Sequence, residues 1–126
     1  MPLVEIVRGA GTRDDVFTTA LGFARRIDKL PLPCRSAPGF VVNRVLMPYL
    51  QEAMLALEEG VPGALIDRVA VEFGMPMGPI ELADVVGLDV GEHVGAIIAQ
   101  ESGRSAPSLP TLAKHLAAKE LGRKSG

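Results

Sequence analysis

The sequence has little of what disulfide frameworks, base-stacking surfaces and membrane spans require. It contains one cysteine, Cys34, so no disulfide can form within the chain, and a reducing, cytoplasmic compartment is expected. Tryptophan is absent and aromatic residues make up 4%, which disfavours the platforms that stack single-stranded nucleic acid. No apolar run reaches the roughly 18 residues of a membrane span, and nothing resembles a signal peptide.

Neither sign of charge dominates. The chain has 13 basic and 15 acidic residues and a net charge of −2, so no basic patch is available for nucleic acid or anionic lipid. We therefore expect neither a nucleic-acid nor a membrane partner. Hydrophobic residues make up 48% of the 126, which is enough to build the core of one modest domain.

The first 36 residues have the pattern of a β-α-β segment. Residues 3–7 form an apolar run typical of a strand buried on both faces, and residues 30–34 form a second strand whose two prolines suit a sheet edge. Between them, Thr12 is the expected N-cap of a helix that extends to about Asp28. Two strands and one helix cannot close a sheet alone, so we expect a remnant of a larger one.

The rest of the chain predicts an all-helical domain. The boundary is expected at Ser36–Gly39, which divides the chain into 1–36 and 37–126. Beyond it, apolar residues recur at helical spacing and glycines mark the helix ends. Five helices are expected: one after the PGF turn with Pro48 inside it, one over 62–73, one over 80–86, one from Asp89 to the 102–108 loop, and one from Pro110 to Gly122.

Glu5 is the first candidate for chemistry, because it lies in the middle of the apolar run "PLVEIVRG". Burying an unpaired carboxylate is costly, so such an acid is displaced, paired or used. It either turns to solvent or pairs with a lysine, or it supports a catalytic base electrostatically. Spacing alone leaves both interpretations open.

Two further segments allow two interpretations each. Asn43 is a poor residue for a helix interior, and it either caps the "PGF" turn locally or directs its amide at a ligand. The elbow "PMGP" at residues 76–79 is rigid and apolar. Spacing alone favours a tight connection between helices, although such a loop can also line a pocket.

The remaining reactive side chains show no chemical motif. His93 and His115 have no second histidine or cysteine at metal-binding spacing, and solvated surface positions are expected for both. Cys34 has no activating partner in the sequence, which favours a buried structural thiol. Gly9-Ala10-Gly11 lacks the third glycine of a dinucleotide-binding fingerprint.

Three segments of the sequence, by their order and spacing, resemble those of a known family: "PLVEIVRG", "APGFVVNRVLMPYLQEA" and "FGMPMGPIELADVVGLDV". Together they resemble the 3-hydroxyacyl-CoA dehydrogenases, in particular the alpha subunits of bacterial fatty-acid oxidation complexes. "LGRKSG" is similar to the start of the family's G-[RK]-K-[ST]-G-x-G-F-Y ending. The resemblance covers essentially the whole chain. It implies a mainly α fold: a helical domain of the 6-phosphogluconate-dehydrogenase-like type, preceded by a β-α-β remnant of a Rossmann domain.

The resemblance also implies a reaction and a set of site residues. The family oxidises L-3-hydroxyacyl-CoA to 3-ketoacyl-CoA in fatty acid β-oxidation and passes the hydride to NAD. Glu5 matches the glutamate that holds and polarises the catalytic histidine of H-F-F-N-P. Asn43 matches the asparagine that contacts the reacting end of the acyl-CoA, and the loop of Pro76, Met77, Gly78 and Pro79 helps line the acyl side of the pocket. A homodimer through the helical domain is implied as well.

The sequence departs from the family at its most chemical motifs. H-F-F-N-P and the G-x-G-x-x-G loop are missing, so we expect a fragment that is inactive alone, with NAD bound by an upstream domain. Ser36 and Ala37 also differ from the pair often found before "PGF". Two alternatives remain: a non-catalytic helical association module, and another hydroxy-acid dehydrogenase of the same superfamily.

Overall fold

The computed structural model describes residues 2–101, 103, 105 and 107–125. The chain divides into two compact units, Met1–Arg44 and Val45–Gly126. The boundary falls inside a helix, a few residues later than the Ser36–Gly39 boundary expected from the sequence.

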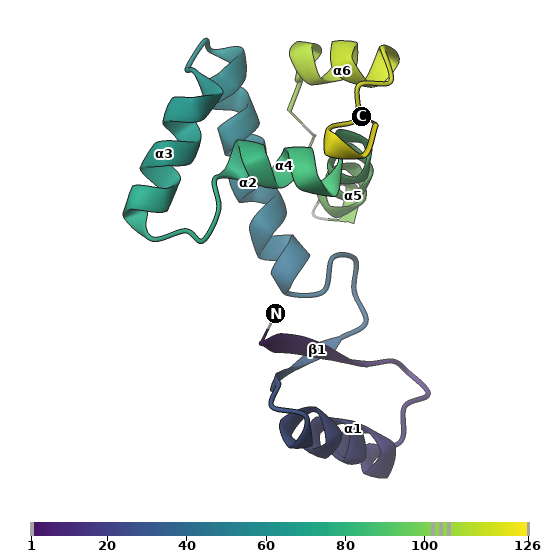
Figure 1. The fold of residues 1–126 in the computed structure, drawn as a ribbon. Coiled ribbons are helices and arrows are strands. Elements are labelled where there is room, and N and C mark those ends of the chain that lie inside the picture. Colours follow the sequence, from purple (N-terminus) through teal and green to yellow (C-terminus); the bar gives the residue numbers. More distant parts are fainter. Residues whose placement is uncertain (1, 102, 104, 106, 126) are drawn as a thin grey trace. The chain divides into compact units, whose positions relative to one another are not determined.

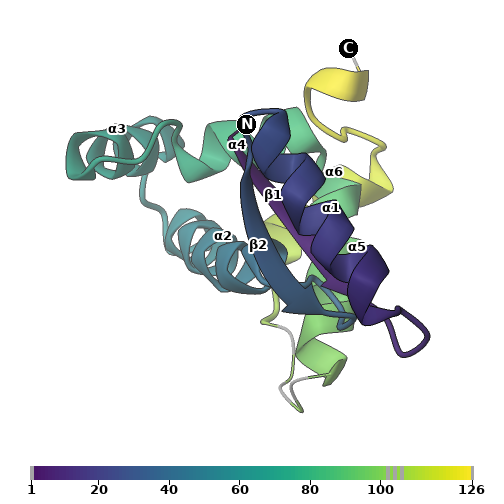
Figure 2. The ribbon, with the colours of Figure 1, turned by 90° about the horizontal axis from the view of Figure 1, so that it is seen from below.

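The first unit is built on two parallel strands. β1 (Leu3–Arg8) pairs with β2 (Leu30–Arg35), and α1 (Asp14–Arg26) connects them (Figure 2). Glu5 lies opposite Leu32 in the register. Among the described residues, β1 is the only strand that pairs with β2. The other edge of β2 has no partner strand among these residues, so the strand can contain prolines, which lack an N–H to donate. The predicted β-α-β order is confirmed.

The predicted start of α1 is wrong by one residue. Arg13, without a capping side-chain bond, occupies the N-cap position. The Thr12 hydroxyl instead accepts a hydrogen bond from the Gly9 N–H at 3.0 Å, and the Thr12 N–H donates to the Gly9 carbonyl at 3.1 Å. Thr12 therefore closes the turn after β1 and is not available to cap the helix. The helix also ends before Asp28, whose φ of 55° is incompatible with its continuation.

The second unit is helical, as predicted (Figure 1). α2 (Val42–Glu58) leads into it and contains Pro48. The other elements are α3 (Gly63–Phe73), α4 (Pro79–Val86), α5 (Leu88–Glu101), α6 (Pro110–Ala117) and a short 3-10 turn, η1 (Arg123–Ser125). α6 is shorter than predicted because Lys119, with φ 60°, ends the run before Gly122.

The core of the helical unit joins α2 to α4 and α5. Met47, Leu50 and Ile98 are buried together, and half-buried apolar side chains surround them: Leu46, Tyr49, Leu82 and Val94. Among the described residues, no helix is long and apolar enough to cross a membrane. The mainly α fold class with an N-terminal β-α-β segment is therefore confirmed.

Candidate functional site

The Glu5 carboxylate accepts two backbone hydrogen bonds. Its Oε1 atom accepts from the N–H of Val41 at 2.7 Å and from the N–H of Val42 at 3.0 Å. Among the described residues, the other carboxylate oxygen accepts no hydrogen bond. Glu5 is half-buried, and its charge is matched by N–H groups at the start of α2. The sequence left open a lysine as the partner of Glu5. In the structure, the partners of Glu5 are these two backbone N–H groups.

A turn with two left-handed residues brings these N–H groups to Glu5. Gly39 has φ 72° and Phe40 has φ 44°, after which α2 begins at Val42. Glycine adopts this conformation readily, whereas phenylalanine does so at a cost of about 1–2 kcal/mol. The cost at Phe40 is offset by the two hydrogen bonds that the turn makes to the carboxylate.

Asn43 occupies the first turn of α2, one residue after the second of these donors. Its side chain is exposed and makes no hydrogen bond with the described residues. The acceptor at this helix start is therefore Glu5, and the local cap considered for Asn43 is not formed. The Asn43 amide is therefore available to a ligand, and its predicted contact with the substrate stays a prediction.

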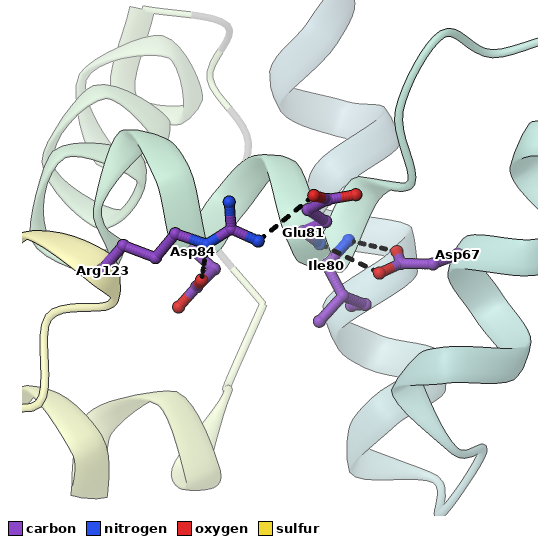
Figure 3. Close-up of polar contacts among 5 residues, drawn as sticks. All are labelled: Asp67, Ile80, Glu81, Asp84 and Arg123. Atoms are coloured by element: carbon purple, nitrogen blue, oxygen red, sulfur yellow. Dashed lines mark hydrogen bonds and ion pairs between the residues drawn. The ribbon is translucent and has the colours of Figure 1, made fainter.

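The PMGP elbow is held by an aspartate on the preceding helix. Asp67 of α3 accepts hydrogen bonds from the N–H of Ile80 at 2.7 Å and of Glu81 at 3.1 Å, so it caps α4 (Figure 3). Gly78 is buried so close to this aspartate that a Cβ there would lie 2.2 Å from the Asp67 Cγ. Pro79 is fully buried and occupies the first helical turn. These contacts make the elbow a tight helix connection.

The sequence motif at the end of the chain is tied to the same helix. Arg123 donates to Asp84 at 3.0 Å and to Glu81 at 3.2 Å, both on α4 (Figure 3). Gly122 has φ 93°, and a Cβ on it would lie 2.4 Å from the Asp84 carbonyl. The segment "LGRKS" thus packs on the helix that follows the elbow.

A third acid holds α6. Glu58, the last residue of α2, accepts hydrogen bonds from the Thr111 N–H at 2.7 Å and from the Thr111 hydroxyl at 2.6 Å. The bond from the Thr111 hydroxyl lowers the pKa of Glu58. Glu5, Glu58 and Asp67 therefore form a set, called here the cap acids, in which each acid caps a helix other than its own element.

Sequence reasoning missed two of the cap acids and Arg123. Glu58 and Asp67 lie on amphipathic helices, each next to one other charged residue, where an acid is expected to be solvated. Glycine or a nonpolar residue occupies the N-cap positions of α4 and α6, and a proline follows each. A helix start without its own capping residue is the one sequence signal that could have suggested a distant acceptor.

The remaining candidates are one buried thiol and two exposed histidines. Cys34 is buried, and burial raises the pKa of its thiol, with a smaller contribution from the charge of Glu5. His93 is exposed, and the exposed His115 contacts Glu120 through Nδ1 at 2.6 Å. The described residues contain no cluster of three His, Cys, Asp or Glu that could hold a metal. The predicted burial of Cys34 and the predicted surface positions of His93 and His115 are confirmed.

Neither helix that follows a strand offers a phosphate site. A pyrophosphate binds N–H groups at a helix start that carries no negative charge. α1 begins with Asp14 and Asp15, and the Glu5 carboxylate occupies the start of α2. Neither of these two helix starts therefore fits the phosphates of a dinucleotide.

Comparison with known proteins gives matches over the whole chain. Residues 39–126 match the family described as 3-hydroxyacyl-CoA dehydrogenase, C-terminal domain, and residues 1–37 match its NAD binding domain. The fatty acid oxidation complex subunit alpha of Psychrobacter cryohalolentis is 41% identical over 128 residues, which cover 100% of this chain and 18% of that protein. That of Idiomarina loihiensis is 40% identical over 131 residues, with the same two shares.

Solved structures also match over the whole chain. FadB2 of M. tuberculosis superimposes with a TM-score of 0.91 at 34% identity, and (S)-3-hydroxybutyryl-CoA dehydrogenase PaaH1 of Ralstonia eutropha with 0.90 at 34%. In both cases the match covers 100% of this chain and 46% of the other. The chain thus spans less than half of these structures and less than a fifth of the curated relatives.

Proposed function

This chain belongs to the 3-hydroxyacyl-CoA dehydrogenase family, and from that premise we propose that it is the helical, substrate-binding part of such an enzyme. The reaction is oxidation of an L-3-hydroxyacyl-CoA to the 3-ketoacyl-CoA. The hydride of the substrate goes to NAD, and the hydroxyl proton goes to a histidine base. In this proposal, residues 1–36 belong to the NAD-binding domain and residues 37–126 form the substrate-binding and dimerisation domain.

The observation that carries the proposal is the state of the Glu5 carboxylate. One oxygen is fixed by two N–H groups, while the other accepts no hydrogen bond from the described residues. A carboxylate held in this way can accept the N–H of an imidazole, orient the ring and stabilise its protonated form. His93 and His115 lie on exposed helix surfaces, so we assign the base to the NAD-binding part of the enzyme.

Asn43 and the elbow supply the proposed contacts to the acyl-CoA. The exposed Asn43 amide has both a donor and an acceptor, which suits the hydroxyl and the developing carbonyl at C3 of the substrate. In the elbow, Pro76 is exposed and Met77 is half-buried, so these two residues are the ones proposed to face the acyl chain. Gly78 and Pro79 are buried and would support this apolar surface from behind.

The proposal can be tested by replacing the matching segment of PaaH1 with residues 1–126, since the two structures superimpose over the whole chain. We expect the chimera to form NADH from 3-hydroxybutyryl-CoA and the isolated chain to form none, because no dinucleotide phosphate site is present in the described part of the chain. NADH formation by the isolated chain, or a folded chimera without activity, would contradict the proposal.

Two substitutions at Glu5 separate its proposed roles. Glu5→Gln keeps an acceptor oxygen for Val41 and Val42 but loses the charge, so we expect the chimera to lose about 100-fold in kcat and little stability. Glu5→Ala removes the acceptor as well, so both kcat and stability should fall. If Glu5→Gln keeps full activity, Glu5 is a structural cap only.

A specific surface supports the second candidate function, association with another copy. α3 has no buried residue, and Leu65, Val69 and Phe73 follow one another at i, i+4 and i+8, with Phe73 89% exposed. α3 lies on the outer side of the helical unit, away from α5 and α6 (Figures 1 and 2). We propose that this stripe is the homodimer contact of the helical domain.

Light scattering tests the homodimer. Val69→Lys should convert a dimer to a monomer, because the charge falls within the stripe. Val71→Lys is the matched control, since Val71 is similarly exposed but lies on another side of α3. Equal masses for the two variants would contradict the proposed contact.

The proposed compartment is the cytoplasm. The single cysteine is buried and unpaired, as in proteins of reducing compartments. Fatty acid oxidation, the process named for the curated relatives, supports the same assignment.

A further inference from the structure

We infer that the turn Gly39–Val42 is a positioning element. Through the N–H groups of this turn, the ionised carboxylate of Glu5 fixes the position of Asn43. The inference rests on the proposed function, because it gives the proposed electrostatic residue and the proposed substrate contact one common support. It assigns a role in the site to two backbone N–H groups, those of Val41 and Val42.

The two N–H groups converge on a single oxygen. The N–H of Val41 and that of Val42 both donate to Glu5 Oε1, at 2.7 and 3.0 Å. They belong to consecutive residues at the start of α2, where N–H groups lack partners within the helix. Oε1 thus has a structural role, and Oε2 is the oxygen left for an imidazole.

The turn is strained, so it requires this carboxylate. Gly39 and Phe40 both have positive φ, and the helix begins with the bond from the Arg44 N–H to the Gly39 carbonyl at 3.2 Å. A phenylalanine persists at φ 44° only where the surroundings offset its cost. Among the described residues, Glu5 provides the only side-chain acceptor for the N–H groups of the turn.

Asn43 follows the second donor directly, so its position depends on the same bonds. The side chain of Asn43 makes no hydrogen bond to the described residues that could hold it independently. When Glu5 loses its charge, the two N–H donors are held less strongly and the turn can relax. Asn43 then moves away from the position it has when Glu5 is ionised.

The first test uses the 126-residue chain and its amide NMR spectrum. In Glu5→Gln the N–H resonances of Val41 and Val42, and the side-chain NH₂ of Asn43, should all move from their wild-type positions while the rest of the spectrum stays dispersed. Shifts at Val41 and Val42 without one at Asn43, or no shift at any of the three, would overturn the inference.

The second test uses the PaaH1 chimera and removes one donor. Val42→Pro deletes the N–H at the first helical position, where proline is tolerated. Asp14→Pro is the control, because Asp14 opens α1 and its N–H is not bound to an acid. Asp14→Ala measures separately the loss of the ion pair between Asp14 and Arg8. We expect Val42→Pro to lower kcat about tenfold, as the loss of one bond to a charged group predicts, with a smaller change in KM.

The pH profile separates positioning from a general loss of structure. With one N–H donor removed, more negative charge is left on the carboxylate, which stabilises the protonated imidazole. The acid limb of kcat should therefore move to higher pH in Val42→Pro and stay in place in Asp14→Pro. An unmoved acid limb with kcat within twofold would overturn the inference. An inactive but folded parent chimera counts against the proposed dehydrogenase function instead, and the NMR comparison with Glu5→Gln still decides the inference.

Discussion

Cys34 illustrates how one buried residue responds to its surroundings. Its Sγ lies 3.7 Å from the Ile6 carbonyl, and burial, then the charge of Glu5, raises the pKa of its thiol. A raised thiol pKa stabilises the fold below the ordinary thiol pKa, and this stabilisation is lost as the pH rises above it. The Cys34 thiol therefore stays protonated at neutral pH.

We predict that Cys34 reacts slowly with iodoacetamide at pH 8 in the native chain. Unfolding in urea should raise the rate at least about 100-fold, because the thiolate is the nucleophile and only the unfolded thiol ionises readily. Glu5→Gln should change the native rate little, since burial is the larger cause. Mass spectrometry of the alkylated peptide measures both rates, and equal native and unfolded rates would contradict the prediction.

Glu58 gives the opposite pH dependence. Its pKa is lowered by the bond from Thr111, so its contribution to stability is complete above the ordinary glutamate pKa and is lost as the pH falls through the lowered value. We predict that the amide resonances of α6 shift as the pH falls below the ordinary glutamate pKa in the native chain. Glu58→Gln should remove that dependence, whereas shifts that persist in Glu58→Gln would assign them to another acid.

At this scale the sequence identified Glu5 but not the other cap acids. Glu5 stood out because a charge inside an apolar run needs an explanation. Asp67 and Glu58 are separated from their partners by 13 or 14 and by 53 or 54 residues, so spacing along the sequence contains no sign of the contacts. The roles of Glu5, Asn43 and the elbow residues remain predictions.

Among the elements, the α3–α4 connection is the most constrained. Gly78 has φ −67°, which any residue can adopt, so its backbone does not require glycine. The restriction is steric, because a Cβ would lie 2.2 Å from Asp67. The same aspartate caps α4, so a displacement would break the cap as well.

We predict that Gly78→Ala destabilises the chain by about 2–3 kcal/mol, the sum of an overpacking cost and a weakened cap. Gly91→Ala is the matched control in α5. A Cβ there meets nothing within 4 Å, so we expect a gain of about 0.5–1 kcal/mol. Urea unfolding followed by circular dichroism measures both values, and a neutral Gly78→Ala would contradict the close approach of Gly78 to Asp67.

Element boundaries were predicted best where glycine ends a helix. Gly74 and Gly87 have φ of 121° and 103°, which only glycine adopts readily, and both helix ends were predicted. The start of α1 was predicted wrongly because the Thr12 hydroxyl is used by the preceding turn. The end of α6 was predicted wrongly because Lys119 takes a positive φ, which its residue type does not suggest.

At the scale of the whole molecule, the two units differ in what they can bury. The helical unit has a core of Met47, Leu50 and Ile98 and contains two of the cap acids together with their partners. The first unit has two strands and one helix, and its buried apolar residues are Ala24 and Cys34. A two-stranded sheet with one helix is too small to be stable alone.

We therefore predict that residues 38–126 fold without the rest and that residues 1–37 do not. The longer piece should keep a helical circular dichroism spectrum and a cooperative thermal transition. The shorter piece should give a poorly dispersed amide NMR spectrum. A longer piece without a cooperative transition would show that its core depends on the first unit.

The fold class was predictable because helical periodicity and glycine punctuation extend over most of the chain. The predicted domain boundary at Ser36–Gly39 stays a prediction, and the two family matches, residues 1–37 and 39–126, meet at the same place. The compact units divide a few residues later, within α2, because the chain continues from the PGF turn directly into that helix. A periodic pattern shows that a helix exists and does not show which unit its first turn joins.

The cap acids also have an order in time. Glu5 precedes α2, Glu58 precedes α6 and Asp67 precedes α4, so each acid leaves the ribosome before the helix that it caps. Because synthesis proceeds from the N-terminus, every one of these helix starts emerges when its acceptor has already been made. The contact of Asp67 with α4 closes a short loop, and the contact of Glu58 with α6 closes a long one. The cap of α4 can therefore form early and the cap of α6 late. The segment that carries Arg123, made after all of these helices, then finds α4 already in place to receive it.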